Sequence, residues 1–200
     1  MAVLSFLSDV FFWLCLTYLI LSLIEFVSHG VLMHQPTWLS RHFKYFQDTL
    51  DEHRSFHHAE CFPGRKMDQG EGDCLKINIK LRPGLSIFGS CWIWGPLLYF
   101  SPLGACIFVL GFLAHNLAWN LVHVQMHTKL PKRARWFQRS RLCLFLARYH
   151  YMHHIYPRKN HNVVCPLIDW VMRTYQSPSE KDLEAMKALG FLPETRKIDA

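Results

Sequence analysis

Two long stretches with almost no formal charge constrain the fold of this chain more than any other feature. Residues 2–24 contain one charged side chain, Asp9, and residues 83–128 contain none. All 22 lysines and arginines lie in two segments, from Arg41 to Arg82 and from Lys129 to Lys197. A soluble basic protein would not leave such stretches without charge. We therefore expect an all-α, integral membrane protein.

The first apolar stretch predicts one long helix over residues 3–33. Such a helix measures about 46 Å at 1.5 Å per residue, whereas a bilayer core is about 30 Å thick. The second stretch suffices for two more crossings, so we expect a hairpin of helices over 84–100 and 103–127, kinked at Gly95-Pro96. A buried helix of a soluble protein is the alternative for residues 3–33, and the second apolar stretch argues against it. The prediction is about three transmembrane helices.

The placement of the cations predicts the orientation. Because no lysine or arginine lies at the N-terminus or in the hairpin turn, we expect the N-terminus outside, with residues 35–82 and 129–200 in the cytoplasm. This fits the endoplasmic reticulum or a bacterial inner membrane. Residues 129–148 hold seven cations and no acid, interleaved with aromatic residues and leucines. We expect a helix on the membrane surface there. A nucleic-acid-binding helix is the alternative, which the neighbouring spans disfavour, so no nucleic-acid partner is predicted.

The C-terminal residues predict a short helix with ordinary helix signals. Ser177-Pro178-Ser179-Glu180 has the pattern of a capping box with proline at the first helical position. Apolar residues follow at helical spacing, and Gly190 ends the pattern. We therefore divide the chain into a membrane domain, residues 1–176, and a C-terminal capped helix and tail, residues 177–200.

Ten of the 13 histidines fall into four short motifs, and this clustering is the strongest chemical signal in the sequence. Each motif lies on the predicted cytoplasmic side or at the cytoplasmic end of a span. The motifs are His29-x4-His34, His53-x3-His57-His58, His123-x3-His127 and His150-x2-His153-His154.

The spacing within each motif predicts which imidazoles converge. On an α-helix, residues three or four apart share a face, which groups His123 with His127 and His150 with the two histidines that follow it. His53 and His57 share a face in the same way. His58 lies about 140° from His53, so it needs a bend or serves a second metal. His29 and His34 are also about 140° apart, and we expect them to straddle two metals.

Ten imidazoles are enough for two sites of five ligands each. Imidazole suits iron, zinc, copper and nickel. Residues 74–168 contain no Asp or Glu, which excludes the carboxylate-rich di-iron site of soluble helix bundles. The sequence therefore predicts a nitrogen-rich dinuclear site carried by a cytoplasmic helical cap. His42 is expected to be solvated, His115 is either functional or a helix contact, and the role of His161 is open.

These motifs resemble those of the fatty acid hydroxylase / sterol desaturase superfamily of membrane non-haem di-iron enzymes, over about residues 20–175. The segment Glu25 to His34 is similar to the first histidine motif of fatty acid 2-hydroxylases. Asn120 to His127 and Arg148 to His154 resemble the third and fourth motifs, and Pro166-Leu167-Ile168-Asp169-Trp170 resembles a segment that follows them. The chain departs from the pattern in the longer second motif and in His161-Asn162-Val163-Val164.

The resemblance implies an O2-dependent lipid hydroxylase with two iron ions, for which zinc can substitute during purification. It implies that the ligands are the ten histidines of the four motifs. Glu25, one turn before His29, either orients that histidine as a supporting carboxylate or forms a helix-end ion pair. The chain has no nucleotide-binding glycine motif and no cysteine cluster, so a reductase, ferredoxin or cytochrome must supply electrons.

Two alternative functions remain open at this point. A desaturase of the same superfamily would remove a second hydrogen from the lipid instead of adding a hydroxyl group. A non-enzymatic, histidine-rich membrane metal carrier would use the same ligands without oxygen chemistry. The sequence does not identify the lipid or the carbon that reacts.

Overall fold

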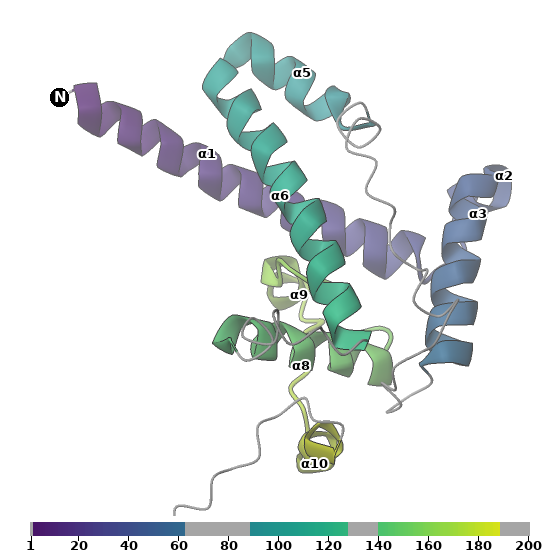
Figure 1. The fold of residues 1–200 in the computed structure, drawn as a ribbon. Coiled ribbons are helices and arrows are strands. Elements are labelled where there is room, and N and C mark those ends of the chain that lie inside the picture. Colours follow the sequence, from purple (N-terminus) through teal and green to yellow (C-terminus); the bar gives the residue numbers. More distant parts are fainter. Residues whose placement is uncertain (1, 63–88, 128–139, 189–200) are drawn as a thin grey trace, which may run out of the picture.

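The computed structural model describes residues 2–62, 89–127 and 140–188, and every regular element within these ranges is a helix (Figure 1). Two segments, η1 and η2, are π-helical. The elements in order are α1 (Ala2–Glu25), η1 (Phe26–Leu32), α2 (Trp38–His42), α3 (Lys44–Leu50), η2 (Asp51–Cys61), α5 (Cys91–Phe100), α6 (Pro102–His127), α8 (Arg141–Ile155), α9 (Leu167–Val171) and α10 (Glu180–Ala188).

The first helix runs as expected. α1 continues without a break into η1, and the 30 residues Val3–Leu32 are long and apolar enough to cross a membrane. Large apolar side chains on it face outward; Val3 is 72% and Phe11 69% exposed. An exposed apolar surface of this extent suits lipid rather than water.

The second apolar stretch forms a helical hairpin, as predicted, but its two arms differ in length. In α6, the 22 residues Pro102–His123 are long and apolar enough to cross a membrane. α5 contains Pro96, and its ten described residues span about 15 Å, about half the thickness of a bilayer core. The start of the predicted first arm, residues 84–88, lies outside the described residues. Two helices of sufficient length are therefore established, and a third crossing is not.

α1 and α6 pack closely and run in the same direction. A Cβ atom on Gly104 would lie 2.7 Å from the ring of Trp13, and one on Gly111 would lie 2.8 Å from a methyl group of Thr17. Glycines two turns apart thus let the two backbones approach, as in membrane helix pairs. Because contacts advance along both helices together, the C-terminal ends of α1 and α6 lie at the same end of the molecule (Figure 1).

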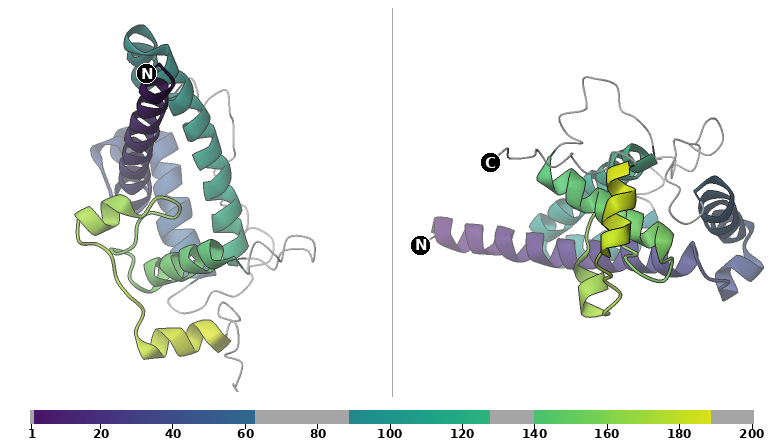
Figure 2. Two further views of the ribbon diagram at one scale, coloured as in Figure 1. Left: turned by 90° about the vertical axis from the view of Figure 1, so that its left-hand side faces the viewer. Right: turned by 90° about the horizontal axis from the view of Figure 1, so that it is seen from below.

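The remaining helices gather at that end. α8 crosses below α6, and α10 packs beneath it (Figures 1 and 2). One core joins them, in which Trp119 and Val122 of α6 contact residues of α8 together with the fully buried Met186 of α10. This core lies directly beside the histidines and fixes the helices that carry them.

Two predicted local features need correction or fall outside the described chain. The cap of α10 is Ser179, whose Oγ accepts from the backbone N–H of Asp182 (3.3 Å) while Asp182 accepts from the Ser179 N–H (3.0 Å). The capping box therefore begins two residues later than predicted, with Asp182 in place of Glu180 as the acid that accepts from the N-cap backbone. Most of the predicted surface helix over 129–148 lies outside the described residues; its last part belongs to α8, which begins after the N-cap Ser140.

Candidate metal centre

The ten histidines of the four motifs converge at one end of the molecule. They come from η1 and the turn after it, from η2, from the last turns of α6 and from α8. Nine of these histidines are buried, and His34 is half-buried. They form two groups of potential ligand nitrogens rather than one cluster.

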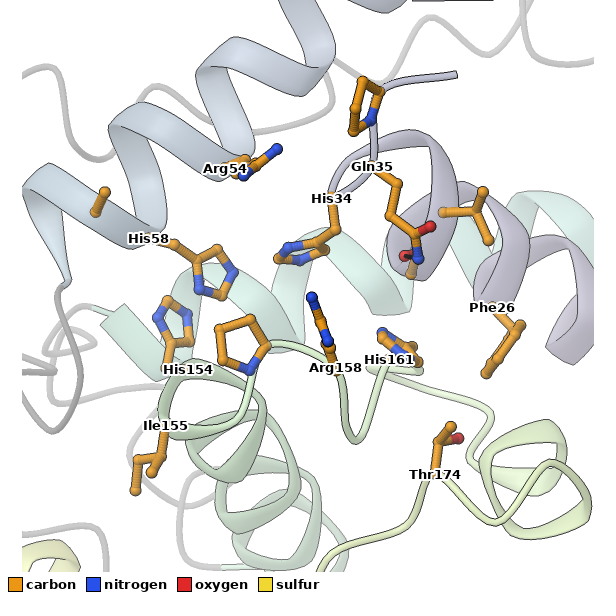
Figure 3. A pocket seen from close by; sticks show the side chains of 15 residues that line it. Phe26, His34, Gln35, Arg54, His58, His154, Ile155, Arg158, His161 and Thr174 are labelled. Carbon is orange, nitrogen blue, oxygen red and sulfur yellow. Dashed lines mark hydrogen bonds between the residues drawn. The ribbon is translucent and has the colours of Figure 1, made fainter. Parts of the chain in front are cut away.

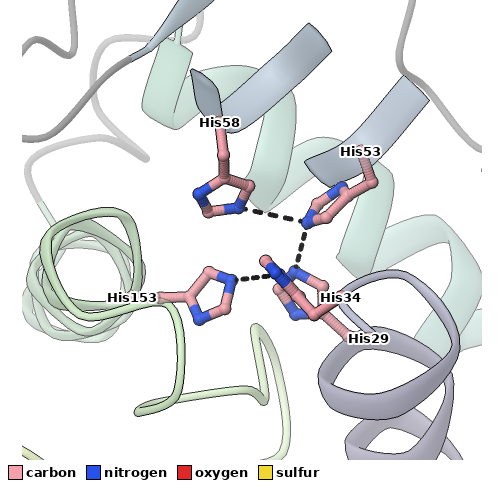
Figure 4. A group of neighbouring side chains, drawn as sticks. All are labelled: His29, His34, His53, His58 and His153. Carbon is pink, nitrogen blue, oxygen red and sulfur yellow. Dashed lines mark hydrogen bonds between the residues drawn. The ribbon is translucent and has the colours of Figure 1, made fainter. Parts of the chain in front are cut away.

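The first group comprises His29, His34, His53, His58 and His153, whose potential ligand nitrogens all lie within 4.8 Å of one another (Figure 4). Three pairs of Nε2 atoms are closer still. The distance is 2.9 Å between His29 and His53, 2.9 Å between His34 and His153, and 3.2 Å between His53 and His58. Side chains from η1, η2 and α8 thus meet at a single point.

The second group contains His57, His123, His127 and His150, again within 4.8 Å of one another. We include His154, because its Nε2 lies 3.1 Å from that of His150 and its ring lies 4.9 Å from that of His57, between centroids. His154 also approaches His58, and so it lies where the two groups meet. The structure therefore shows a group of five histidines and a group of four, with His154 between them.

The assignment of histidines to sets differs from the α-helical expectation because two segments are π-helical. In a π-helix the N–H bonds to the carbonyl five residues back, and the Met33 N–H donates to the Ser28 carbonyl in this way (3.1 Å). Residues five apart then share a face. His29 and His34 therefore serve the same group, and the prediction that they straddle two metals is wrong.

The same π-helical geometry explains the second motif. In η2 it brings His53 and His58 together in the first group and places His57 in the second group. The π-helix supplies the bend that His58 was predicted to need. His53 and His57, which were expected to converge, lie in different groups. On α8 the predicted triple also divides, with His153 in the first group and His150 in the second.

The spacing of the imidazole nitrogens fits metal coordination. Two ligand nitrogens about 2.1 Å from one ion and at right angles to each other lie about 3.0 Å apart. The closest Nε2 pairs, at 2.9 to 3.2 Å, have this separation. Both ring nitrogens of His57 and Nε2 of His123 are buried and have no hydrogen-bond partner in the described parts of the chain. Bound cations would satisfy these nitrogens, so the buried groups can hold metal ions.

Burial keeps the imidazoles outside the membrane helices neutral. Burial lowers the pKa of His154 to about 3 and, together with the neighbouring His29, that of His34 to about 2. Burial and the surrounding imidazoles also hold the pKa values of His58, His127 and His150 well below the usual 6.5. Because metals bind the neutral form, these ligands are ready at neutral pH.

Backbone carbonyls orient three of the ligands. The Nδ1–H of His29 donates to the carbonyl of His161, and that of His153 donates to the carbonyl of Lys159 (2.8 Å). His154 Nδ1 lies 3.4 Å from the carbonyl of Phe62. Donation from Nδ1 fixes the ring tautomer and leaves the Nε2 lone pair for a metal. Residues outside the four motifs, His161 among them, therefore contribute through their backbone carbonyls.

Glu25 is completely buried but acts on a loop rather than directly on His29. Its Oε1 accepts from the backbone N–H groups of Val163 and Val164 (2.8 and 2.9 Å), and its Oε2 accepts from that of Cys165 (2.9 Å). The predicted direct support of His29 is not observed. His29 instead contacts the His161 carbonyl at the start of the same loop, so Glu25 can influence it only through the loop.

A second buried carboxylate, Asp169, completes this arrangement. Its two oxygens accept from the backbone N–H groups of His161 (3.0 Å) and Asn162 (2.7 Å). Five successive amides, residues 161–165, thus donate to two carboxylates from different parts of the chain. Asp169 was not among the predicted site residues. The signal that could have found it is its position as the first acid after the acid-free stretch 74–168.

The three remaining histidines lie outside both groups. His42 is exposed and donates to the carbonyl of Trp38 (2.8 Å), in accord with its predicted solvated position. His115 Nε2 lies 3.4 Å from Glu25 Oε2, so it is a contact between α6 and α1. His161 lies beside the first group, with its ring centroid 5.7 Å from that of His153.

A cavity of about 1240 Å³ opens beside the histidines (Figure 3). His34, His58 and His154 line its inner part, and Phe26, Val31 and Ile155 supply apolar wall. Its size suits a drug-sized or larger organic molecule. His34 and His58 of the first group, and His154 between the groups, are thus reachable from the cavity.

Comparisons with protein-family models, with curated proteins and with solved structures find no match to this chain. The geometry therefore supports a conclusion about the chemistry of the site, namely that two buried histidine groups at the end of two apolar helices can hold metal ions, and it leaves the reaction to be proposed.

Proposed function

We propose that this protein is a membrane-bound di-iron monooxygenase that hydroxylates a C–H bond of a lipid, using O2 and electrons from a separate donor. The observation that carries the proposal is the two neighbouring histidine groups, almost entirely buried, next to an accessible cavity with apolar lining residues. The resemblance of the four motifs to the fatty acid hydroxylase / sterol desaturase superfamily points to the same chemistry.

The proposed arrangement in the membrane has three crossings and a cytoplasmic cap. α1 and α6 run in parallel, so their histidine-bearing ends share one side, and the cations follow those ends in the sequence. A substrate with a long chain can then enter from the bilayer, where the outward faces of both helices are apolar. Its reacting carbon would sit at the cavity beside His34 and His58.

Within this proposal the protein side chains bind, orient and exclude water. The first group would hold one iron through His29, His34, His53, His58 and His153, and the second would hold the other through His57, His123, His127, His150 and His154. Two iron ions, when bound, supply the O2-dependent redox chemistry that side chains lack. The carbonyls of His161 and Lys159 keep their ligands in one tautomer. The apolar wall at Phe26 and Val31 limits competing reactions with water.

The products of cells grown under labelled oxygen test the reaction. Cells with and without the chain are given ¹⁸O2, and their lipids are compared by mass spectrometry. A lipid that gains one labelled oxygen atom supports hydroxylation, whereas one that loses two hydrogens indicates a desaturase. Unchanged lipids with altered cellular iron or zinc uptake would instead indicate a metal carrier.

Metal content provides the second test. Purified protein is expected to contain two transition-metal ions per chain by elemental analysis, with zinc acceptable in place of iron. The His58→Ala variant should lose metal from the first group, and the His127→Ala variant should lose it from the second. His42→Ala is the matched control, because His42 is exposed and outside both groups, and it should retain both ions. One ion or none in the unaltered protein would contradict the dinuclear proposal.

A further inference from the structure

The charge of the cavity is concentrated at two arginines. Arg54 of η2 and Arg158, which follows α8, both line the cavity and are exposed. Figure 3 shows their side chains on opposite sides of His34. No Asp or Glu lines the cavity, and neither guanidinium group forms an ion pair with a described residue. Two positive charges at the cavity therefore lack a counter-ion from the described parts of the protein.

The neighbouring groups do not account for these charges. The other polar residues of the lining are histidines, Gln35 and Thr174, and none of them carries a negative charge. Phe26, Val31 and Ile155 supply apolar surface to the same cavity. The cavity thus combines a cationic part with an apolar part, which is the pattern that an amphiphile with an anionic head matches. Guanidinium groups bind carboxylates and phosphates in bidentate fashion.

We propose that Arg54 and Arg158 bind the anionic head, a carboxylate or a phosphate, of an amphiphilic substrate whose chain lies along the apolar wall. That the bound amphiphile is a substrate rests on the proposed function. Its binding to the two arginines can be measured without any turnover. It names a substrate class that the histidine motifs do not specify. A neutral lipid of the same chain length has no group for the two guanidinium ions.

Equilibrium binding to the full chain, purified in a non-ionic detergent and loaded with zinc, tests the inference. The probes are oleate, oleyl phosphate and oleyl alcohol, which share one chain and differ in the head. We expect at least one of the two anions to bind about tenfold or more tightly than the alcohol, because each charge-assisted contact is worth about a factor of ten. The anion that binds identifies the head as carboxylate, phosphate or either.

Matched variants separate this site from general attraction of anions to a basic protein. Arg54→Gln/Arg158→Gln should bind the anions as weakly as the alcohol, with alcohol binding unchanged. Arg41→Gln/Arg141→Gln removes the same net charge from two exposed arginines that do not line the cavity, and it should bind like the unaltered protein. Equal binding of alcohol and anions, or equal losses in both double variants, would overturn the inference.

The outcome is independent of the proposed function. Zinc content measured on the same samples reports whether the histidine groups hold metal, and the Arg54→Gln/Arg158→Gln variant should retain it. A protein that lacks metal but still selects anions through the two arginines would contradict the proposed function alone. A protein that holds two ions and hydroxylates a neutral lipid equally well in both double variants would contradict the anionic-head inference alone.

Discussion

At the scale of single residues, the site depends on carboxylates that touch no metal ligand. Glu25 and Asp169 together accept five successive backbone amides of residues 161–165. The His161 carbonyl in this loop accepts from His29. The loop therefore connects two buried acids to one ligand. A substitution of either acid should change how His29 is held and so lower the metal affinity of the first group.

We predict that Glu25→Gln weakens metal binding without abolishing it. The amide presents one acceptor oxygen, and its NH2 group faces N–H donors that Glu25 now satisfies. We expect a loss of about 2–4 kcal/mol in unfolding free energy and about 10- to 100-fold in metal affinity. Thermal unfolding and competition with a chelator measure the two effects. Asp9→Asn, at an exposed position of the same helix, is the control and should change neither.

The buried imidazoles also predict a dependence on pH. In the folded protein, burial lowers the pKa of His34 to about 2 and of His154 to about 3, whereas the unfolded chain has values near 6.5. The unfolded state therefore takes up protons first, and the metal-free protein should lose stability as the pH falls below about 6.5, and continue to lose it toward pH 3. Thermal unfolding of metal-free protein between pH 8 and 5 measures this. An unfolding temperature that stays constant over this range would contradict it, and saturating zinc should oppose the loss.

At the scale of elements, the two π-helical segments decide which ligands share a metal group. We predict that one alanine inserted after Val31 eliminates the first group, because it rotates His34 by about 100° relative to His29. Elemental analysis should show one ion per chain instead of two. An alanine inserted after Ser101, in the turn between α5 and α6, leaves the register of every ligand unchanged and is the control. Retention of two ions in the first variant would show that the π-helical register is unimportant.

The same elements show what the sequence can and cannot predict. The long first helix, the hairpin and the ten ligands follow from hydropathy and from histidine clustering, which need no tertiary information. The pairing of His29 with His34 cannot be predicted in this way. The same residues can form an α-helix or a π-helix with the same composition and nearly the same apolar pattern. Asp169 was not predicted for a related reason. Its position after an acid-free stretch singles it out, but its role depends on backbone amides, which the sequence pattern does not show.

At the scale of the whole molecule, the parallel course of α1 and α6 makes a topological prediction. Tyr99, in the hairpin and 86% exposed, should face the outside, and Ser177, before α10, should face the cytoplasm. Single cysteines at these positions, in a chain whose native exposed thiols Cys15 and Cys106 are replaced, should react differently with a membrane-impermeant maleimide. The Tyr99→Cys variant should react in intact cells, and the Ser177→Cys variant only after permeabilisation. Reaction of both in intact cells would exclude the three-crossing proposal.

The hydrogen bonds of Glu25 also determine when the site can form during synthesis of the protein. It lies at the end of α1, and the amides that it binds are 138 to 140 residues further along the chain. At 5–20 residues per second, translation of that interval takes about 7 to 28 s. In the proposed membrane arrangement, the acidic side chain of Glu25 has none of these amide partners during that interval, which is a costly state. The metal centre can therefore form only after residues 161–165 have been synthesised. Until then, cellular quality control can recognise the chain as incompletely folded.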